Sequence, residues 1–151
     1  MTKTILLAED DENDAALLKI TLTAAGVSNP IVTVTDGDQV LDYFKGEGRF
    51  SNRTTFPLPS VLFLDLRMAR LGGYEVLEWL QKRPEFKPLI VVITAFHEVK
   101  EVQKAYLLGA HSFLTKPTKP EDIHNLRKGF PHYWESLPPT QGSAGTEILL
   151  G

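Results

Sequence analysis

Asp65 is the residue of this sequence with the clearest potential for chemistry. It ends an apolar run at 61–64 that is typical of a fully buried strand, and Arg67 and a glycine pair at 72–73 follow it. A carboxylate in such a position can cap a helix, bind a metal ion or act as a nucleophile. Which of these it does depends on the polar groups that the fold places beside it.

Three other apolar runs also end in polar or charged residues. These strand-end residues are Glu9, Asp10 and Asp11 after the first run, Thr94 and Ala95 at the fourth, and Lys116 and Pro117 after the fifth. If the strands are parallel, their carboxyl ends meet at one edge of the sheet, which is where open α/β folds bind ligands. Several carboxylates, one hydroxyl and one ammonium group would then share a shallow pocket.

This combination of groups suits phosphoryl transfer. Clustered carboxylates raise one another's pKa unless a cation lies among them, and Mg²⁺ binds one or two carboxylates together with waters and phosphate oxygens. A carboxylate oxygen of Asp65 can attack phosphorus and form an acyl phosphate. The cation and Lys116 would offset the charge of the phosphoryl group, and the Thr94 hydroxyl would donate to one of its oxygens.

Each of these residues also has an ordinary structural explanation. An acidic residue after a strand often caps the next helix, which is an alternative for Asp10 and the expected role of Asp11 or Asn13. A threonine at a strand end often satisfies a nearby backbone group, and a lysine there is most often solvated. The joint occurrence of these polar strand ends, in this order, favours the chemical interpretation.

Five short apolar runs alternate with helical patterns along the chain. They predict strands at 4–9, 31–35, 61–65, 89–94 and 111–115, and helices within 11–26, 37–46, 72–83, 98–109 and 120–129. In the first helix Asn13 or Asp14 can serve as the cap and Gly26 marks the end; Gly46 ends the second. The alternation predicts a doubly wound α/β fold, in which a five-stranded parallel sheet carries helices on both faces.

One internal connection departs from the strand–helix rhythm, and one of the predicted helices has a marked apolar stripe. The connection at 45–59 is long for such a fold, and is therefore either functional or loosely ordered. The fourth helix places Val99, Val102 and Tyr106 on one apolar stripe.

The composition places limits on the class of protein. The net charge is −3 without basic blocks, which argues against nucleic-acid binding, and there is no cysteine for disulfides or thiolate chemistry. No apolar run approaches the roughly 20 residues of a membrane span, and the N-terminal run is too short for a signal peptide, so we expect a cytoplasmic protein without membrane contact. We expect one domain over 1–137 and a flexible C-terminal tail over 138–151, which is rich in Pro, Gly, Ser and Thr.

The polar strand ends, in their order, resemble those of the receiver domain of bacterial two-component response regulators. The resemblance runs from about residue 3 to 126 and implies a flavodoxin-like sheet of strand order 2-1-3-4-5. It implies that Asp65 is the phosphoacceptor and that Mg²⁺ is the cofactor. The implied metal ligands are the carboxylates of Asp10 and Asp65, the backbone carbonyl of Arg67, and Glu9 through a bound water. The implied phosphate-binding and switch residues are Thr94, Ala95, Lys116 and Phe113, and Gly73 matches the glycine that follows the phosphorylation loop.

Two softer features are similar to small stand-alone regulators that partner phytochrome-type histidine kinases. They are the connection "LDYFKGEGRF…FPLPSVLFLDL" and the aromatic segment "HYWESLPP". The resemblance implies a signalling protein rather than an enzyme, which accepts its phosphoryl group from a histidine kinase. Output would run through protein binding, phosphate relay or a homodimer on the face of the fourth helix, fifth strand and fifth helix.

The sequence departs from the family pattern at three places. Glu9 replaces the more usual aspartate, which leaves a carboxylate for ion binding. Ala69 stands where the family usually has proline, so the loop after Asp65 loses a fixed φ. Gly129 and a nearby proline interrupt the last helix, so the aromatic residues that follow either form a dimer contact or fold back over the core; these are Phe130, Tyr133 and Trp134.

Other functions fit the residues less well. A phosphatase of the haloacid-dehalogenase type needs a second aspartate two positions after its nucleophile, and Arg67 occupies that position. A flavin-binding module needs a loop that holds phosphate after the first strand, whereas the "EDDEND" segment would repel one. The remaining alternative is a receiver fold that acts as a binding scaffold without phosphorylation.

Overall fold

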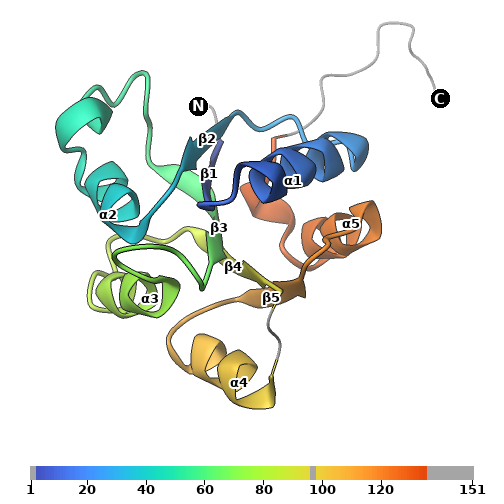
Figure 1. The fold of residues 1–151 in the computed structure, drawn as a ribbon. Coiled ribbons are helices and arrows are strands. Elements are labelled where there is room, and N and C mark those ends of the chain that lie inside the picture. Colours follow the sequence, from blue (N-terminus) through green and yellow to red (C-terminus); the bar gives the residue numbers. More distant parts are fainter. Residues whose placement is uncertain (1–2, 96–97, 136–151) are drawn as a thin grey trace, which may run out of the picture.

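The computed structural model describes residues 3–95 and 98–135 as an α/β fold (Figure 1). Its strands are β1 (Thr4–Ala8), β2 (Ile31–Val34), β3 (Pro59–Asp65), β4 (Leu89–Thr94) and β5 (Ser112–Thr115). Its helices are α1 (Glu12–Ala24), α2 (Gly37–Lys45), α3 (Gly73–Gln81), α4 (Val99–Leu107) and α5 (Pro120–Gly129), with 3-10 turns η1 (Gly48–Phe50) and η2 (Pro131–Tyr133). All strand pairs are parallel and the order is β2-β1-β3-β4-β5, which confirms the predicted fold class and topology.

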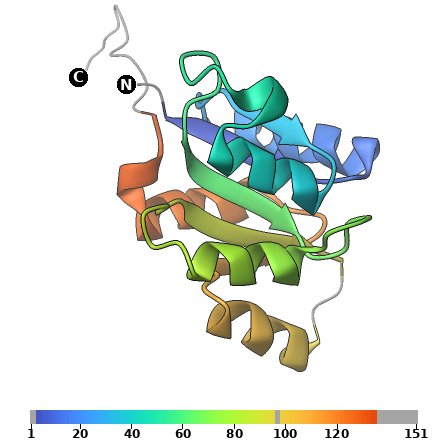
Figure 2. The same ribbon diagram turned by 90° about the vertical axis from the view of Figure 1, so that its left-hand side faces the viewer.

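Helices cover both faces of the sheet, with α1 and α5 on one face and α2 and α3 on the other (Figures 1 and 2). Alternate residues of each strand enter different cores: Leu62 and Leu64 pack with α2 and α3, whereas Val61 and Phe63 pack with α1 and α5. Because both faces are buried, the central strands are apolar at nearly every position. None of the helices in the described residues has the length and apolar character of a membrane span.

The predicted helix ends hold in most places, with one correction. Asp11 is the N-cap of α1, because its carboxylate accepts from the backbone N–H groups of Asn13 and Asp14; the expectation that Asn13 or Asp14 caps this helix is wrong. Asp11 is the other candidate that the sequence offers. Because it precedes the first turn, Asn13 and Asp14 lie within that turn, where their backbone N–H groups lack partners inside the helix and donate to the Asp11 carboxylate. Gly26 and Gly46 lie just after the ends of α1 and α2, as predicted, and both adopt a positive φ.

The apolar stripe of α4 is not its buried face. Val99 is 72% exposed and Tyr106 is also exposed, whereas Ala105 is the buried side chain of this helix. The helix packs beside β5 at the edge of the sheet (Figure 1), and Ala105 is the side chain that it buries in the core. Most of the stripe therefore faces solvent.

The 45–59 connection is packed rather than loosely ordered. The Arg53 guanidinium donates to the carbonyls of Tyr43 and Phe44 at 2.7 and 2.6 Å, at the C-terminal end of α2. Gly46 makes room for it, since a Cβ there would lie 3.0 Å from Arg53 Nε. The ring of Phe50 lies 4.9 Å from that of Tyr43. The connection thus covers the end of α2, and the Arg53 guanidinium supplies hydrogen-bond donors to two carbonyls of its last turn.

The aromatic segment after α5 folds back over the core, which decides between the two alternatives for Trp134. Its indole is 4% exposed, lies 6.4 Å from the ring of Phe63 and donates to the carbonyl of Phe130 at 2.9 Å. The Asn29 side chain binds the backbone on both sides of Trp134: its amide nitrogen donates to the carbonyl of Tyr133, and its oxygen accepts from the backbone N–H of Glu135. Trp134 is therefore part of the core on the α1–α5 face and is not available as a dimer contact. The expected tail, 138–151, lies outside the described residues.

We expect Arg53→Met to lower the free energy of unfolding by about 2 kcal/mol, because it removes charge-assisted hydrogen bonds to carbonyls at the end of α2. Urea denaturation followed by circular dichroism measures this. Arg49→Met is the matched control, since Arg49 is exposed and lies over the Phe50 ring. Equal losses in the two variants would contradict the assigned role of Arg53.

Candidate functional site

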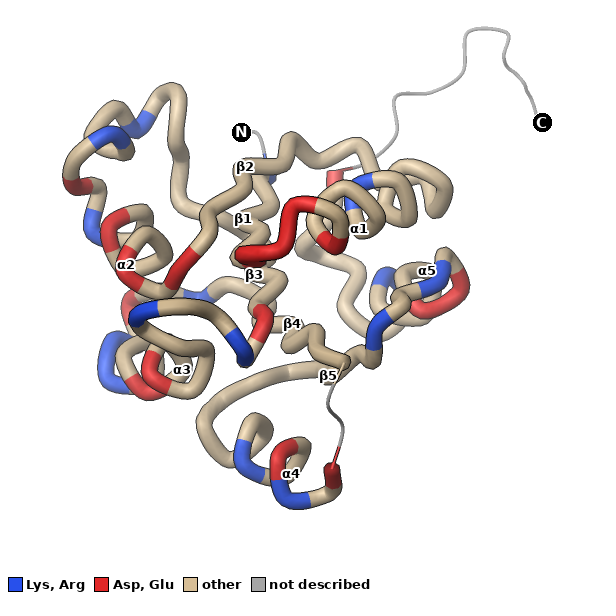
Figure 3. The backbone as a smooth tube through the Cα atoms, in the orientation of Figure 1, with Lys and Arg blue, Asp and Glu red and all other residues tan. Residues whose placement is uncertain are grey.

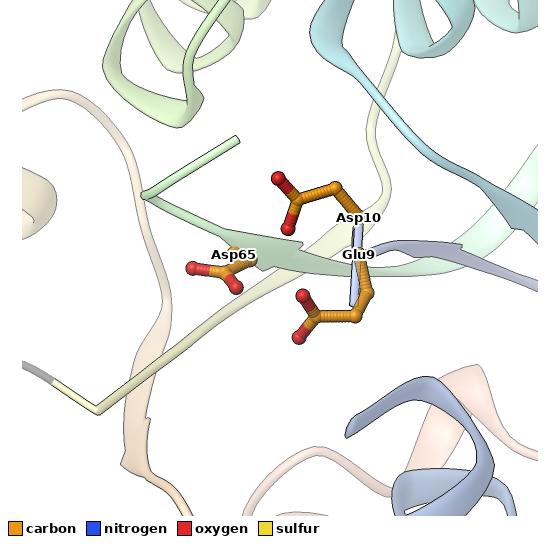
Figure 4. A group of neighbouring side chains, drawn as sticks. All are labelled: Glu9, Asp10 and Asp65. Atoms are coloured by element: carbon orange, nitrogen blue, oxygen red, sulfur yellow. The ribbon is translucent and has the colours of Figure 1, made fainter. Parts of the chain in front are cut away.

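Three carboxylates meet at the carboxyl edge of the sheet. Oxygens of Glu9, Asp10 and Asp65 all lie within 4.8 Å of one another (Figure 4). The parallel register brings Glu9 and Asp65 together. Ala8 lies opposite Leu64, and the residues that follow these two are Glu9 and Asp65. Glu9 and Asp65 are 2% and 4% exposed, whereas Asp10 is open to solvent. Figure 3 shows the run of acidic residues between β1 and α1 at this edge.

Lys116 links the buried carboxylates. Its ammonium lies 2.8 Å from Asp65 Oδ2, 2.9 Å from Asp14 Oδ2 and 2.5 Å from Glu9 Oε1. The three contacts use the three donors of the ammonium group. The end of β5 places it there, and its backbone N–H donates to the carbonyl of Thr94 on the neighbouring strand. Its role as a solvated surface lysine is thereby excluded.

The charges at this site are unbalanced. The pKa of Glu9 is raised to about 7: burial raises it most, the hydrogen bond from Lys116 lowers it, and the neighbouring Asp65 carboxylate raises it. Burial lowers the pKa of Lys116, but its hydrogen bonds to the carboxylates raise it by more, so that the group stays protonated. One ammonium thus faces several carboxylates, and an additional cation with oxygen ligands would relieve the remaining repulsion.

The loop after Asp65 wraps closely around its carboxylate. The backbone N–H of Arg67 donates to Asp65 Oδ1 at 2.9 Å. At Gly73 a Cβ would lie 2.7 Å from Leu66 Cα and 2.8 Å from the carbonyl oxygen of Asp65, so any side chain would force the loop away. The resemblance singled out this glycine, and the close approach gives the physical reason for it.

Contacts with α2 anchor the part of the loop that lacks the usual proline. Gly37 donates to the carbonyl of Leu71 at 3.0 Å, and a Cβ at Gly37 would lie 2.3 Å from that oxygen. Arg70 adopts a φ of 64° and pairs with Asp38 at 3.0 Å. These contacts lie beyond Ala69 and restrain the loop by tertiary interactions in place of a fixed φ. Sequence reasoning missed them, because no local pattern marks the pairing of this loop with α2.

The remaining predicted residues divide between the rim and the core. Thr94 ends β4 at the same edge and is buried, and Ala95 follows it on the surface. Phe113 lies in β5 and is half-buried against the core on the α2–α3 face, away from the carboxylates. Asp14, in the first turn of α1, joins the site through Lys116, a contact that sequence reasoning missed because the residue was considered only as a cap.

Comparison with known proteins agrees with this geometry. The family model described as the response regulator receiver domain matches residues 5–128. The chain belongs to this family. In sequence, this receiver domain is 28% identical to the response regulator Rcp1 of Synechocystis sp. over 133 residues, which cover 87% of the chain and 88% of Rcp1.

Solved structures of response regulators share the fold. The bacteriophytochrome response regulator RtBRR is 33% identical, with a TM-score of 0.80 over 95% of this chain and 87% of that one. The phosphorylated cyanobacterial phytochrome response regulator RcpA is 27% identical, with a TM-score of 0.72 over 89% and 94%. The Mn²⁺-bound form of Rcp1 gives a TM-score of 0.71 at 27% identity over 90% and 99%. The receiver domain is thus related to phytochrome response regulators.

We expect Lys116→Met to lower the free energy of unfolding of the metal-free protein by about 3 kcal/mol, because it leaves Glu9 and Asp65 buried without their cation. The loss should shrink as the pH falls below about 7, since Glu9 then takes up a proton. Urea denaturation at several pH values measures it.

Lys19→Met on the exposed surface of α1 is the control for loss of a positive charge. A Lys116 variant as stable as this control at neutral pH would show that the three contacts contribute nothing to the fold.

Proposed function

We propose that this receiver domain accepts a phosphoryl group on Asp65 from the phosphohistidine of a histidine kinase, with Mg²⁺ as cofactor. The observation that carries the proposal is the environment of the Asp65 carboxylate. One oxygen accepts from the backbone of Arg67, the other from Lys116, and two further carboxylates lie beside it. Such a site can hold a nucleophile, a cation and an incoming phosphoryl group together.

In the reaction, an oxygen of Asp65 attacks phosphorus, and the bond from phosphorus to the kinase histidine breaks. The electron pair of that bond returns to the imidazole nitrogen, and the aspartyl phosphate remains. Lys116 stays protonated and offsets charge on the phosphoryl oxygens, while the Thr94 hydroxyl donates to one of them. Positioning of these groups supplies most of the catalysis, as is general for phosphoryl transfer.

The donor set fits a magnesium ion. Asp10 and Asp65 would supply carboxylate oxygens, Arg67 its backbone carbonyl, and Glu9 would act through a bound water; hard oxygen donors and open coordination positions are what Mg²⁺ requires. When bound, the ion neutralises charge on the transferring phosphoryl group. The Mn²⁺-bound form of the related Rcp1 supports a divalent cation in this family member.

Phosphorylation would shift a two-state equilibrium. Thr94 moves toward the phosphoryl group, Phe113 turns further inward from its half-buried position, and Ala95 makes room at the surface. The face formed by α4, β5 and α5 changes shape as a result and binds a target protein or a second copy of the chain. The phytochrome response regulators among the relatives support a kinase of the phytochrome type.

The alternative is a receiver fold that acts as a scaffold without phosphorylation. A scaffold has no need for a buried aspartate whose two oxygens both face donors at an open edge. The presence of the acceptor, the hydroxyl and the lysine at one rim favours phosphorylation.

Incubation of the wild type with acetyl phosphate and Mg²⁺ should add one phosphoryl group, and Asp65→Asn should remove this labelling entirely, because an amide oxygen is not a nucleophile for phosphorus. Intact-protein mass spectrometry measures the added group. Asp42→Asn on α2 is the control and should be labelled like the wild type. Labelling of the Asp65 variant to the same extent would place the acceptor elsewhere.

The affinity for Mg²⁺ should fall as the pH is lowered below about 7. Glu9 takes up a proton in that range, so the cation can bind only when this proton is released. The affinity for Mg²⁺ therefore falls by up to about tenfold for each pH unit. Isothermal titration calorimetry at several pH values measures this. Glu9→Gln should flatten the profile, whereas Asp10→Asn should weaken binding at every pH and keep the slope. An unchanged slope in Glu9→Gln would assign the titration to another group.

A further inference from the structure

Polar contacts tie helix α4 to the loop that carries the phosphoacceptor. An Arg67 guanidinium nitrogen lies 2.7 Å from Glu101 Oε1, across from the loop to the first turn of α4. The Tyr74 hydroxyl donates to the carbonyl of Glu101 at 3.4 Å, and the Lys104 ammonium lies 4.2 Å from the Tyr74 ring centroid. Apolar packing of this helix is slight, since Ala105 is its buried residue. The position of α4 therefore depends strongly on these polar contacts.

Glu101 depends on Arg67 for compensation of its charge. Its side chain is 21% exposed, and among the described residues its Oε2 is buried without a hydrogen-bond partner. A buried carboxylate oxygen that lacks a donor is unfavourable, and loss of the partner of the other oxygen leaves the whole charge poorly solvated. The pair is thus sensitive to any group that competes for the guanidinium.

Arg67 is placed to meet such a competitor. Its backbone nitrogen lies 2.9 Å from Asp65 Oδ1, so its side chain begins two bonds away from an atom in contact with the phosphoacceptor. Phosphorylation of Asp65 adds negative charge and strong acceptor oxygens at this point. A guanidinium is well suited to bind a phosphoryl group, because its planar set of donors matches the oxygens.

We propose that Arg67 exchanges partners on phosphorylation: its guanidinium pairs with Glu101 in the unphosphorylated protein and with the phosphoryl oxygens in the phosphorylated one. Glu101 is then a positioning residue, which acts by competing for Arg67. The exchange leaves Glu101 without its partner and loosens α4. This helix already carries three exposed apolar side chains, Val99, Tyr106 and Leu107, so the exchange changes the position of an exposed apolar surface. This inference rests on the proposed function, since it requires Asp65 to carry the phosphoryl group.

A double-mutant cycle with beryllofluoride, an analogue of the phosphoryl group, tests the exchange. The affinity is measured in Mg²⁺ for the wild type, Glu101→Gln, Arg67→Gln and the double variant. Glu101→Gln should tighten binding about two- to fivefold, because the competing charge is gone. Arg67→Gln should weaken it about tenfold. In the Arg67→Gln background, Glu101→Gln should change the affinity by less than about twofold.

Glu98→Gln is the matched control, because it removes the same charge from the N-cap of α4, three positions away from Glu101. It should leave the affinity within about twofold of the wild type. A merely structural role for Glu101 predicts weaker binding on substitution, so an increase in affinity that needs Arg67 identifies the competition.

Two results overturn the exchange: an affinity of Glu101→Gln equal to or below that of the wild type, or a gain of the same size with and without Arg67. Failure of the proposed function looks different, because the wild type and Asp65→Asn would then respond alike to beryllofluoride. In that case the exchange falls with it. If the wild type binds through Asp65 and the cycle shows no coupling, only the exchange is wrong.

Discussion

The structure depends on one electrostatic arrangement, in which Lys116 compensates carboxylates that the sheet has taken out of water. Glu9 and Asp65 are buried because they lie at the carboxyl ends of two central strands: Glu9 follows β1 directly, and Asp65 is the last residue of β3. The ammonium of Lys116 contacts both. Removal of charge from water is unfavourable unless an opposite charge and hydrogen bonds replace the solvent. The arrangement holds the fold together at this edge and also leaves an excess of negative charge that a cation can relieve. Stability and chemistry therefore arise from the same contacts.

The two edges of the sheet have different tasks. At the carboxyl edge, short polar loops position the candidate site, and the loop after Asp65 is held between α2, through Gly37 and Arg70, and α4, through Arg67. At the amino ends of the strands, the segment after α5 folds over the core, and Trp134 packs on Phe63. Glu135 therefore lies at the end of the sheet that is remote from Asp65. In the proposed function, a change at the site reaches the surface through α4 and β5 rather than through the segment after α5.

Much of this could be predicted from the sequence because the signals are local. Period and length of the apolar runs predicted the strands and the sheet, and the polar strand ends predicted which side chains meet at the rim. Contacts between distant segments carry no local signal, so the pairing of Arg67 with Glu101, the role of Asp14 beside Lys116 and the anchoring of the loop by Gly37 were not predicted. The apolar stripe of α4 is a related case: periodicity shows which residues share a face, but the position of the helix beside β5, at the edge of the sheet, decides whether that face is buried. The aromatic residues after α5 left two alternatives open until their packing was known.

The central claim is that Asp65 receives the phosphoryl group while the surrounding carboxylates hold a divalent cation. A crystal structure of the protein grown with Mg²⁺ and beryllofluoride tests it most directly. Our account predicts beryllium bonded to an Asp65 carboxylate oxygen, a magnesium ion coordinated by Asp10 and Asp65, and contacts from Lys116 and Thr94 to the fluorine atoms. A structure from such crystals in which Lys116 still spans Glu9 and Asp65, and neither the ion nor the analogue lies at this rim, would contradict it.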